Sequence, residues 1–392
     1  MTLPLSSVLT RQFFRVTSMN FFFFASVNAF VLLPLYIQRL GGTEAQIGVV
    51  MGMYSAAGIF CQPVVGAWVD RVGRRPFMVF GVSLVVVASL GFSLFASLPV
   101  FGVLRVFQGI GFSAFFVSNY TMVVDLVPPE RRGWALGIFG ISGLLSTALS
   151  PLAGELVIRC FGFPAFFAMT TLLALAALAL ALRIRESGGA MAAHARGGRV
   201  IREGMAEILR VHMALAFFFG LGSGTIFTFL PTFGVLLGVS NLALFYTAYA
   251  GAAMLVRALG GGLSDTLGRR AVIVPSMFVQ AATTGILAAL AVLIGARATI
   301  PVLPFLFLSG LLAGGAHGFL YPALAALLMD ETAEARRGSV VGVFSSVFLV
   351  GNALGAFLFG YVSHGWGYGV MWSTLTLLLV AGFTASFRLR AS

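Results

Sequence analysis

The stretch Gly66-Ala67-Trp68-Val69-Asp70-Arg71-Val72-Gly73-Arg74-Arg75 decides the fold, because a related stretch recurs in the second half of the chain. The second copy reads Gly261-Gly262-Leu263-Ser264-Asp265-Thr266-Leu267-Gly268-Arg269-Arg270 and starts 195 positions further on. Two more pairs recur in the same order at nearly the same offset: Leu33-Pro34 with Leu230-Pro231, and Asp125, Arg131-Arg132-Gly133 with Asp330, Arg336-Arg337-Gly338. Three ordered pairs indicate that the chain is an internal duplication.

The composition indicates that both halves lie in lipid. Of the 392 residues, 59% are hydrophobic and only 9% are charged, and the mean hydropathy is +1.02. A globular interior of this size cannot hide so much apolar surface, so a water-soluble fold is excluded. Cys61 and Cys160 fall within or at the end of apolar runs, and we expect both to be free thiols.

A helix needs about 20 mostly apolar residues to cross the hydrocarbon core, and the sequence predicts twelve such spans. They lie near residues 13–37, 45–67, 76–98, 100–126, 134–158, 164–183, 211–236, 243–264, 271–294, 302–329, 338–361 and 368–387. The first run is too long for a signal core and lacks a small-residue cleavage site, so we expect a retained helix.

Arginine placement predicts the orientation. All 24 basic residues are arginine, and the net charge is +12. Nineteen arginines fall in the termini and loops of one side, three (Arg39, Arg159 and Arg297) fall on the other, and Arg105 and Arg257 lie inside spans. The positive-inside rule makes the arginine-rich side cytoplasmic. The basic charge therefore reflects topology, and no nucleic-acid partner is expected.

We therefore predict an all-α membrane protein of two pseudo-symmetric six-helix bundles, with both termini cytoplasmic. The predicted parts are an N-terminal bundle over residues 1–185, a cytoplasmic linker over 186–210 and a C-terminal bundle over 211–392.

The doubled loop resembles the signature of the major facilitator superfamily, Gly-x-x-x-Asp-Arg-x-Gly-Arg-Arg, between the second and third helices. The resemblance covers essentially the whole chain and points to the bacterial efflux branch. Arg105-Val106-Phe107-Gln108-Gly109 matches the family's fourth-helix motif. Ser150-Pro151-Leu152-Ala153-Gly154-Glu155 resembles its antiporter motif but has Ser and Glu in place of the first and last Gly.

The resemblance implies a conformational switch at the cytoplasmic face, made of charges that separate as the two halves move. Asp70 and Arg74 are spaced i, i+4, so they can pair if the helix continues, and Gly73 permits a sharp turn. The implied switch residues are Gly66, Asp70, Arg71, Gly73, Arg74 and Asp125, with Asp265, Arg269 and Asp330 in the second copy. The alternative is that these charges only set the topology.

The resemblance also implies that the first helix of each three-helix group lines a central cavity. Polar residues of the fourth helix share a face that is too polar for lipid, and the first helix carries a second, mixed stripe. The expected cavity residues are Asn20, Phe24, Asn28, Arg105, Gln108, Phe112, Asn119, His317 and Tyr321. Hydrogen bonding between helices explains the asparagines equally well.

Two side chains are candidates for proton coupling, His317 and Glu155. His317 lies deep in the tenth span, and histidine ordinarily titrates near pH ~6.5, although it also suits a neutral, hydrogen-bonded structural role. Glu155 lies near the outer end of the fifth span, where Arg159 at i+4 is its expected ion-pair partner. Arg257, inside the eighth span, is a functional candidate because an intramembrane arginine is costly, or else it holds helices together.

The sequence lacks the loop that binds nucleotide phosphates, since that loop requires a lysine. It also shows no metal-ligand spacing and no nucleophile with a base beside it. We therefore expect no enzyme activity and no cofactor. We expect a monomeric, multi-pass protein of a bacterial inner membrane that exports a small organic molecule against proton entry. The alternatives are a symporter or facilitator for a small organic anion, suggested by Arg105 and Arg257, and a scaffold or sensor without transport.

Overall fold

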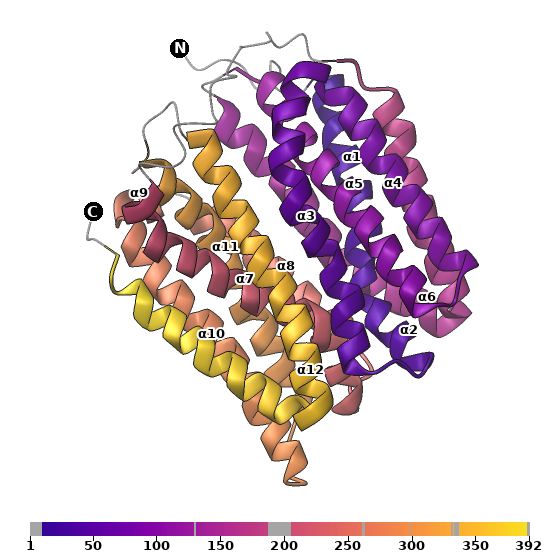
Figure 1. Ribbon diagram of the computed structural model, residues 1–392, viewed down its shortest axis with the longest axis vertical. Helices are drawn as coiled ribbons and strands as arrows, with labels where there is room; N and C mark the ends of the chain where they lie inside the picture. Colours follow the sequence, from indigo (N-terminus) through magenta and orange to yellow (C-terminus); the bar gives the residue numbers. More distant parts are fainter. Residues whose placement is uncertain are drawn as a thin grey trace. The chain divides into compact units, whose positions relative to one another are not determined.

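The computed structural model describes residues 10–128, 131–186, 205–260, 263–298, 300–330, 332 and 337–389. Throughout these ranges the chain forms helices joined by turns and contains no β-strand (Figure 1). The elements are α1 (Arg11–Ala29), the 3₁₀ turn η2 (Phe30–Leu32), α2 (Leu33–Arg39), α3 (Glu44–Val72), α4 (Arg74–Leu94), α5 (Leu98–Asp125), α6 (Arg132–Leu182), α7 (Met205–Leu236), α8 (Ala243–Gly260), α9 (Leu263–Thr266), α10 (Arg269–Gly295), α11 (Val302–Asp330) and α12 (Arg337–Ser386).

Ten helical stretches in the described residues are long and apolar enough to cross a membrane. Two of them, α6 with 51 residues and α12 with 50, are more than twice the length that one crossing requires. Each is interrupted by one glycine whose backbone is not helical, Gly162 (φ 79°, ψ −179°) and Gly367 (φ 80°, ψ 171°). These glycines fall between the spans predicted at 134–158 and 164–183 and at 338–361 and 368–387. A single residue thus stands where the sequence suggested a short loop.

The chain divides into two compact units. The first comprises residues 1–33 and 56–193, and the second comprises residues 34–55 and 194–392. This division differs from the predicted bundles, because residues 34–55 group with the second unit. Within that unit, Ser55 donates a hydrogen bond to Oδ1 of Asn352 at 2.8 Å, and Glu44 lies 3.7 Å from His364.

In the first unit, α1 packs along α6, and α4 packs against α5 and α6. Aromatic rings fill the space between these helices: Phe23 stacks on Phe115 at 3.7 Å between ring centroids, and Phe30 lies 4.8 Å from Phe92. The Ser26 hydroxyl donates to the Thr170 carbonyl at 2.8 Å, so a buried hydrogen bond also joins α1 to α6. Aromatic side chains therefore make up much of the core of this unit.

The second unit repeats this pairing. Here α7 packs along α12, and α10 packs against α11 and α12, so α7, α10, α11 and α12 take the places of α1, α4, α5 and α6. A buried cluster of α7, α10, α11 and α12 side chains forms its core, among them Leu215, Ile273, Leu324 and Phe344. The order of packing therefore agrees with the duplication in the sequence.

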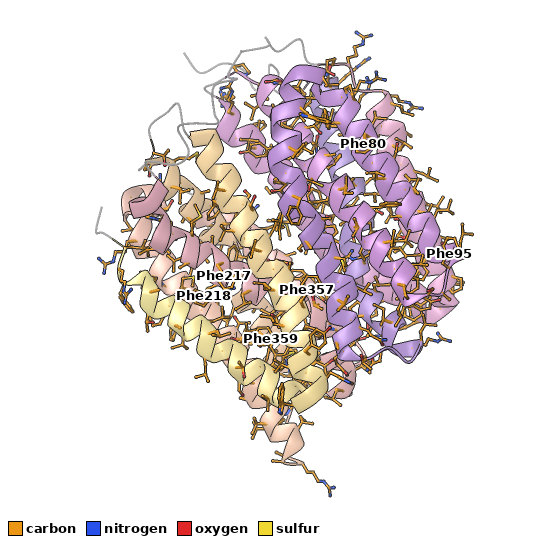
Figure 2. The ribbon with its side chains drawn as sticks, viewed as in Figure 1. Phe80, Phe95, Phe217, Phe218, Phe357 and Phe359 are labelled. Atoms are coloured by element: carbon orange, nitrogen blue, oxygen red, sulfur yellow. The ribbon has the colours of Figure 1, made fainter. Side chains whose placement is uncertain are left out.

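Large apolar side chains cover the outer faces of the helices (Figure 2). Phe80 on α4 is 50% exposed, and Phe95 at its end is 52% exposed. Phe359 on α12 is by contrast buried. Exposed rings of this size are typical of surfaces that contact acyl chains.

Candidate functional site

The loop between α3 and α4 is fastened by an ion pair and a turn. Helix α3 ends at Val72, Gly73 has φ of 107°, and α4 begins at Arg74. Asp70 and Arg74 therefore lie on opposite sides of a turn. Nε of Arg74 donates to Oδ2 of Asp125, the last residue of α5, at 3.0 Å. The side chains of Gly66, Asp70 and Arg71 lie outside the described residues.

The second copy has the same geometry. Gly268 has φ of 86°, and Nε of Arg269 donates to Oδ2 of Asp330, the last residue of α11, at 3.0 Å. Arg269 also donates from Nη1 to Ser264 Oγ at 2.8 Å. The Asp265 side chain lies outside the described residues. The sequence duplication thus places one arginine–aspartate bridge at the corresponding position of each unit.

Glu186 is a member of the first loop that sequence reasoning missed. Its Oε1 accepts from the backbone N–H of Arg74 at 2.8 Å, and its Oε2 accepts from that of Arg75 at 3.0 Å. A carboxylate here satisfies two of the unpaired N–H groups at the start of α4 and complements the positive end of the helix dipole. The only signal in the sequence was an acidic residue just after the sixth predicted span, and the predicted linker over 186–210 includes this residue.

The expected cavity residues of the first unit form two groups. Asn119 on α5 donates to Oδ1 of Asn20 on α1 at 3.0 Å, and Asn20 donates to Ser142 Oγ at 2.8 Å. Asn28 donates to Ser146 and Thr147 at 3.0 and 2.9 Å. These bonds join α1 to α5 and α6, as the alternative interpretation of the asparagines requires. Whether the same residues also contact a solute stays a prediction.

Arg105 and Gln108 form the second polar group of this unit. Nη1 of Arg105 donates to Oε1 of Gln108 at 2.8 Å, and both side chains are buried. Near them, Phe24 meets Phe112 edge-on at 5.9 Å, and Phe112 stacks on Phe116 at 5.4 Å. The i, i+3 spacing that placed Arg105 and Gln108 on one face therefore corresponds to a direct bond.

His317 on α11 lies between two aromatic rings of the second unit. Its ring centroid is 5.3 Å from that of Phe219 on α7 and 5.5 Å from that of Tyr249 on α8. Its Nδ1 is buried without a hydrogen-bond partner among the described residues. Tyr321, one turn along, shares a hydrogen bond of 3.3 Å with Ser345 of α12. Sequence reasoning identified His317 and Tyr321, but it could not identify Phe219 or Tyr249, which come from other helices.

Glu155 pairs with Arg159, as the spacing predicted. Cys61 and Cys160 are both free thiols. Within the described residues no three histidine, cysteine or acidic side chains gather as metal ligands would.

Two units of packed membrane-length helices with matching charged loops define a polytopic membrane protein of duplicated design. The chain matches the model of the Major Facilitator Superfamily over residues 16–296 and 242–391, and it belongs to that family. It is therefore a membrane transporter by family, not an enzyme.

Relatives and solved structures agree with this assignment. The chain is 23% identical to the staphylopine export protein of Staphylococcus aureus (strain Mu50) over 395 residues, covering 96% of this chain and 95% of that protein. It is 24% identical to the multidrug resistance protein MdtG of Salmonella choleraesuis, covering 86% of this chain and 84% of that protein.

Two solved structures share the fold. A mutant of the nucleoside transporter NupG has a TM-score of 0.78 at 14% identity, covering 96% of this chain and 99% of that one. A D-xylose–proton symporter has a TM-score of 0.78 at 15% identity, covering 96% of each chain.

Proposed function

We propose that the chain is a secondary active transporter that exports a small organic molecule across a bacterial inner membrane by alternating access, in exchange for protons. The observation that carries this proposal is the pair of matching bridges, Arg74–Asp125 and Arg269–Asp330. Charged contacts at equivalent places of two duplicated units are suited to being made and broken as the units move. The similarity to the staphylopine export protein supports the outward direction.

The topology within this proposal has twelve spans, with both termini cytoplasmic. It counts α6 and α12 as two spans each, divided at Gly162 and Gly367, and it follows the bias of the arginines. A chain with all twelve spans and its own cavity works as a monomer. The linker at 186–210 falls mostly outside the described residues.

The energy source is proposed to be the proton gradient, because the sequence has no nucleotide-binding loop. His317 is the preferred proton carrier. It sits in the middle of α11, and its Nδ1 has no hydrogen-bond partner in the described part of the chain, whereas Glu155 is already paired with Arg159.

Coupling is tested by reconstituting the protein in liposomes that contain a trapped pH dye. A ligand found by thermal-shift screening is added outside, since a ligand of the folded state raises the melting temperature. Proton-coupled transport gives a ligand-dependent change of internal pH that is absent from empty liposomes. Solute movement without any pH change would contradict coupling and favour a facilitator.

A second candidate function, uptake or facilitated passage of a small organic anion, is favoured by one observation. Arg257 on α8 has no carboxylate partner among the described residues. Flux of a labelled acid in both directions, unchanged when the pH gradient is collapsed, would support this candidate over proton-driven export.

A further inference from the structure

A polar cluster lies inside the second unit, between α8 and α11. These two helices approach closely: a Cβ atom added at Gly314 of α11 would lie only 1.9 Å from the Tyr249 carbonyl oxygen of α8. The close contact brings His317 of α11 beside Tyr249. Arg257 lies two turns after Tyr249 on α8, and its neighbour Val256 packs against α11, where a Cβ at Gly318, the residue after His317, would lie 2.8 Å from the Val256 side chain.

The rings around this cluster form an unbroken series. The distances between ring centroids are 5.5 Å from Tyr249 to His317 and 5.3 Å from His317 to Phe219. They are 5.1 Å from Phe219 to Phe348 and 5.8 Å from Phe348 to Tyr321. The charge of the half-buried Arg257 interacts with the first and last of these rings, Tyr249 and Tyr321. The cluster therefore combines one cation with aromatic surface and two phenolic hydroxyls.

Arg257 carries the only formal charge of the cluster among the described residues. The titratable side chains that interact with its charge there are Tyr249, Tyr321 and His317, and none of them is a carboxylate. The buried Nε of Arg257 and the buried Nδ1 of His317 both lack a hydrogen-bond partner among the described residues. A guanidinium inside a bilayer without a compensating anion is unfavourable, and so is a buried polar atom without a partner.

One chemical group, a carboxylate, would compensate the charge of Arg257 and pair with both buried nitrogens, Nε of Arg257 and Nδ1 of His317. A carboxylate accepts two parallel N–H bonds from a guanidinium, which presents its donors in a planar fork. It also neutralises the charge and provides an oxygen for an imidazole N–H. A single cation balances a single carboxylate, and the surrounding rings suit an apolar or aromatic body attached to it.

We propose that Arg257 and His317 bind the carboxylate of the transported solute, with Phe219, Tyr249, Tyr321 and Phe348 around its apolar part. This inference rests on the proposed transport function and assigns its substrate class, an organic acid with one negative charge. The site lies wholly within the second unit.

The test measures binding without transport. The purified full chain in detergent is melted in the presence of benzoate, phenylacetate and hexanoate, and separately with the amide of each acid. We expect at least one acid to raise the melting temperature while its amide, equal in shape but uncharged, does not. Arg257→Gln should weaken binding of that acid at least tenfold, and His317→Gln severalfold.

Two controls keep the test decisive. Arg297→Gln removes an exposed arginine of the same unit and should leave binding unchanged. If Arg257→Gln fails to give folded protein, Arg257→Lys retains the charge without the fork, and we expect it to bind severalfold more weakly than wild type. Asp265→Asn tests the competing idea that Arg257 merely pairs with that acid, and it should leave binding of the carboxylate intact.

Three results would overturn the inference: no stabilisation of wild type by any of the acids, equal stabilisation by the amides, or full binding in Arg257→Gln. None of them depends on protons or on flux. A transporter that moves neutral solutes but binds no acid would refute this site alone. A protein that binds acids but shows no coupled flux would refute the proposed function alone.

Discussion

The Nε atom of Arg74 lies 3.0 Å from Oδ2 of Asp125, and this bridge joins the first residue of α4 to the last residue of α5. The corresponding bridge of the second unit, Arg269–Asp330, has the same atoms and the same distance. The two differ in exposure: the aspartate side chain is 19% exposed in the first and 57% in the second. Electrostatic attraction is less screened in the more buried pair.

Asp125→Asn should therefore lower the transport rate more than Asp330→Asn. We expect a loss of at least tenfold for the first and a few-fold for the second, with both proteins inserted and monodisperse. Initial rates of solute flux in liposomes measure this, and the two variants serve as each other's matched control. Equal, wild-type rates in both would leave the charges with a topological role only.

Asp70 and Asp265 occupy corresponding positions of the two repeated loops. Asp70→Asn should abolish transport without preventing insertion. Asp265→Asn should be milder, because Thr266 replaces the arginine found at Arg71 and makes the second copy the weaker match.

Glu186→Gln should loosen the start of α4. Glutamine retains one acceptor oxygen, but it loses the charge that faces the N–H groups of Arg74 and Arg75. A charge at an exposed helix N-terminus contributes roughly 0.3–1 kcal/mol, so a small fall in melting temperature is expected, larger for Glu186→Ala. High salt should shrink the difference between wild type and Glu186→Gln. A melting temperature that does not change for either variant would show that the contact is dispensable.

Gly314→Ala should destabilise the second unit, while Gly315→Ala should not. An added Cβ at Gly314 meets the Tyr249 carbonyl at 1.9 Å, whereas one at Gly315 meets nothing within 4 Å. Forcing α8 and α11 apart costs about 1–3 kcal/mol, and alanine is otherwise better than glycine in a helix by roughly 0.8–1 kcal/mol. Thermal unfolding in detergent should rank Gly315→Ala above wild type and Gly314→Ala below it. The reverse order would contradict the close approach of the two helices.

The sequence predicted those features that depend on local pattern and repetition. The spans follow from hydropathy, the ends of α5 and α11 at Asp125 and Asp330 follow from charge placement, and the Glu155–Arg159 pair follows from i, i+4 spacing. The location of the breaks at Gly162 and Gly367 also followed, although each proved to be one residue.

Other features depend on how helices rotate and pack, and spacing within one helix does not determine that. Tyr249 and Phe219 meet His317 from helices that are distant along the chain. Glu186 reaches Arg74 across 112 positions, with no motif to connect them. Asn20 and Asn119 were each recognised as polar residues in a span, but their mutual bond appears only when α1 and α5 are docked.

The measurement that tests the account most directly is uphill solute movement in liposomes under an imposed pH gradient, comparing wild type, His317→Gln and Glu155→Gln. The account predicts that wild type moves solute against its own gradient and stops when an ionophore collapses the pH difference. His317→Gln should permit only downhill exchange, and Glu155→Gln should retain uphill movement, because Glu155 is already paired with Arg159. Wild-type flux that ignores the pH gradient would contradict the proton-coupled exporter.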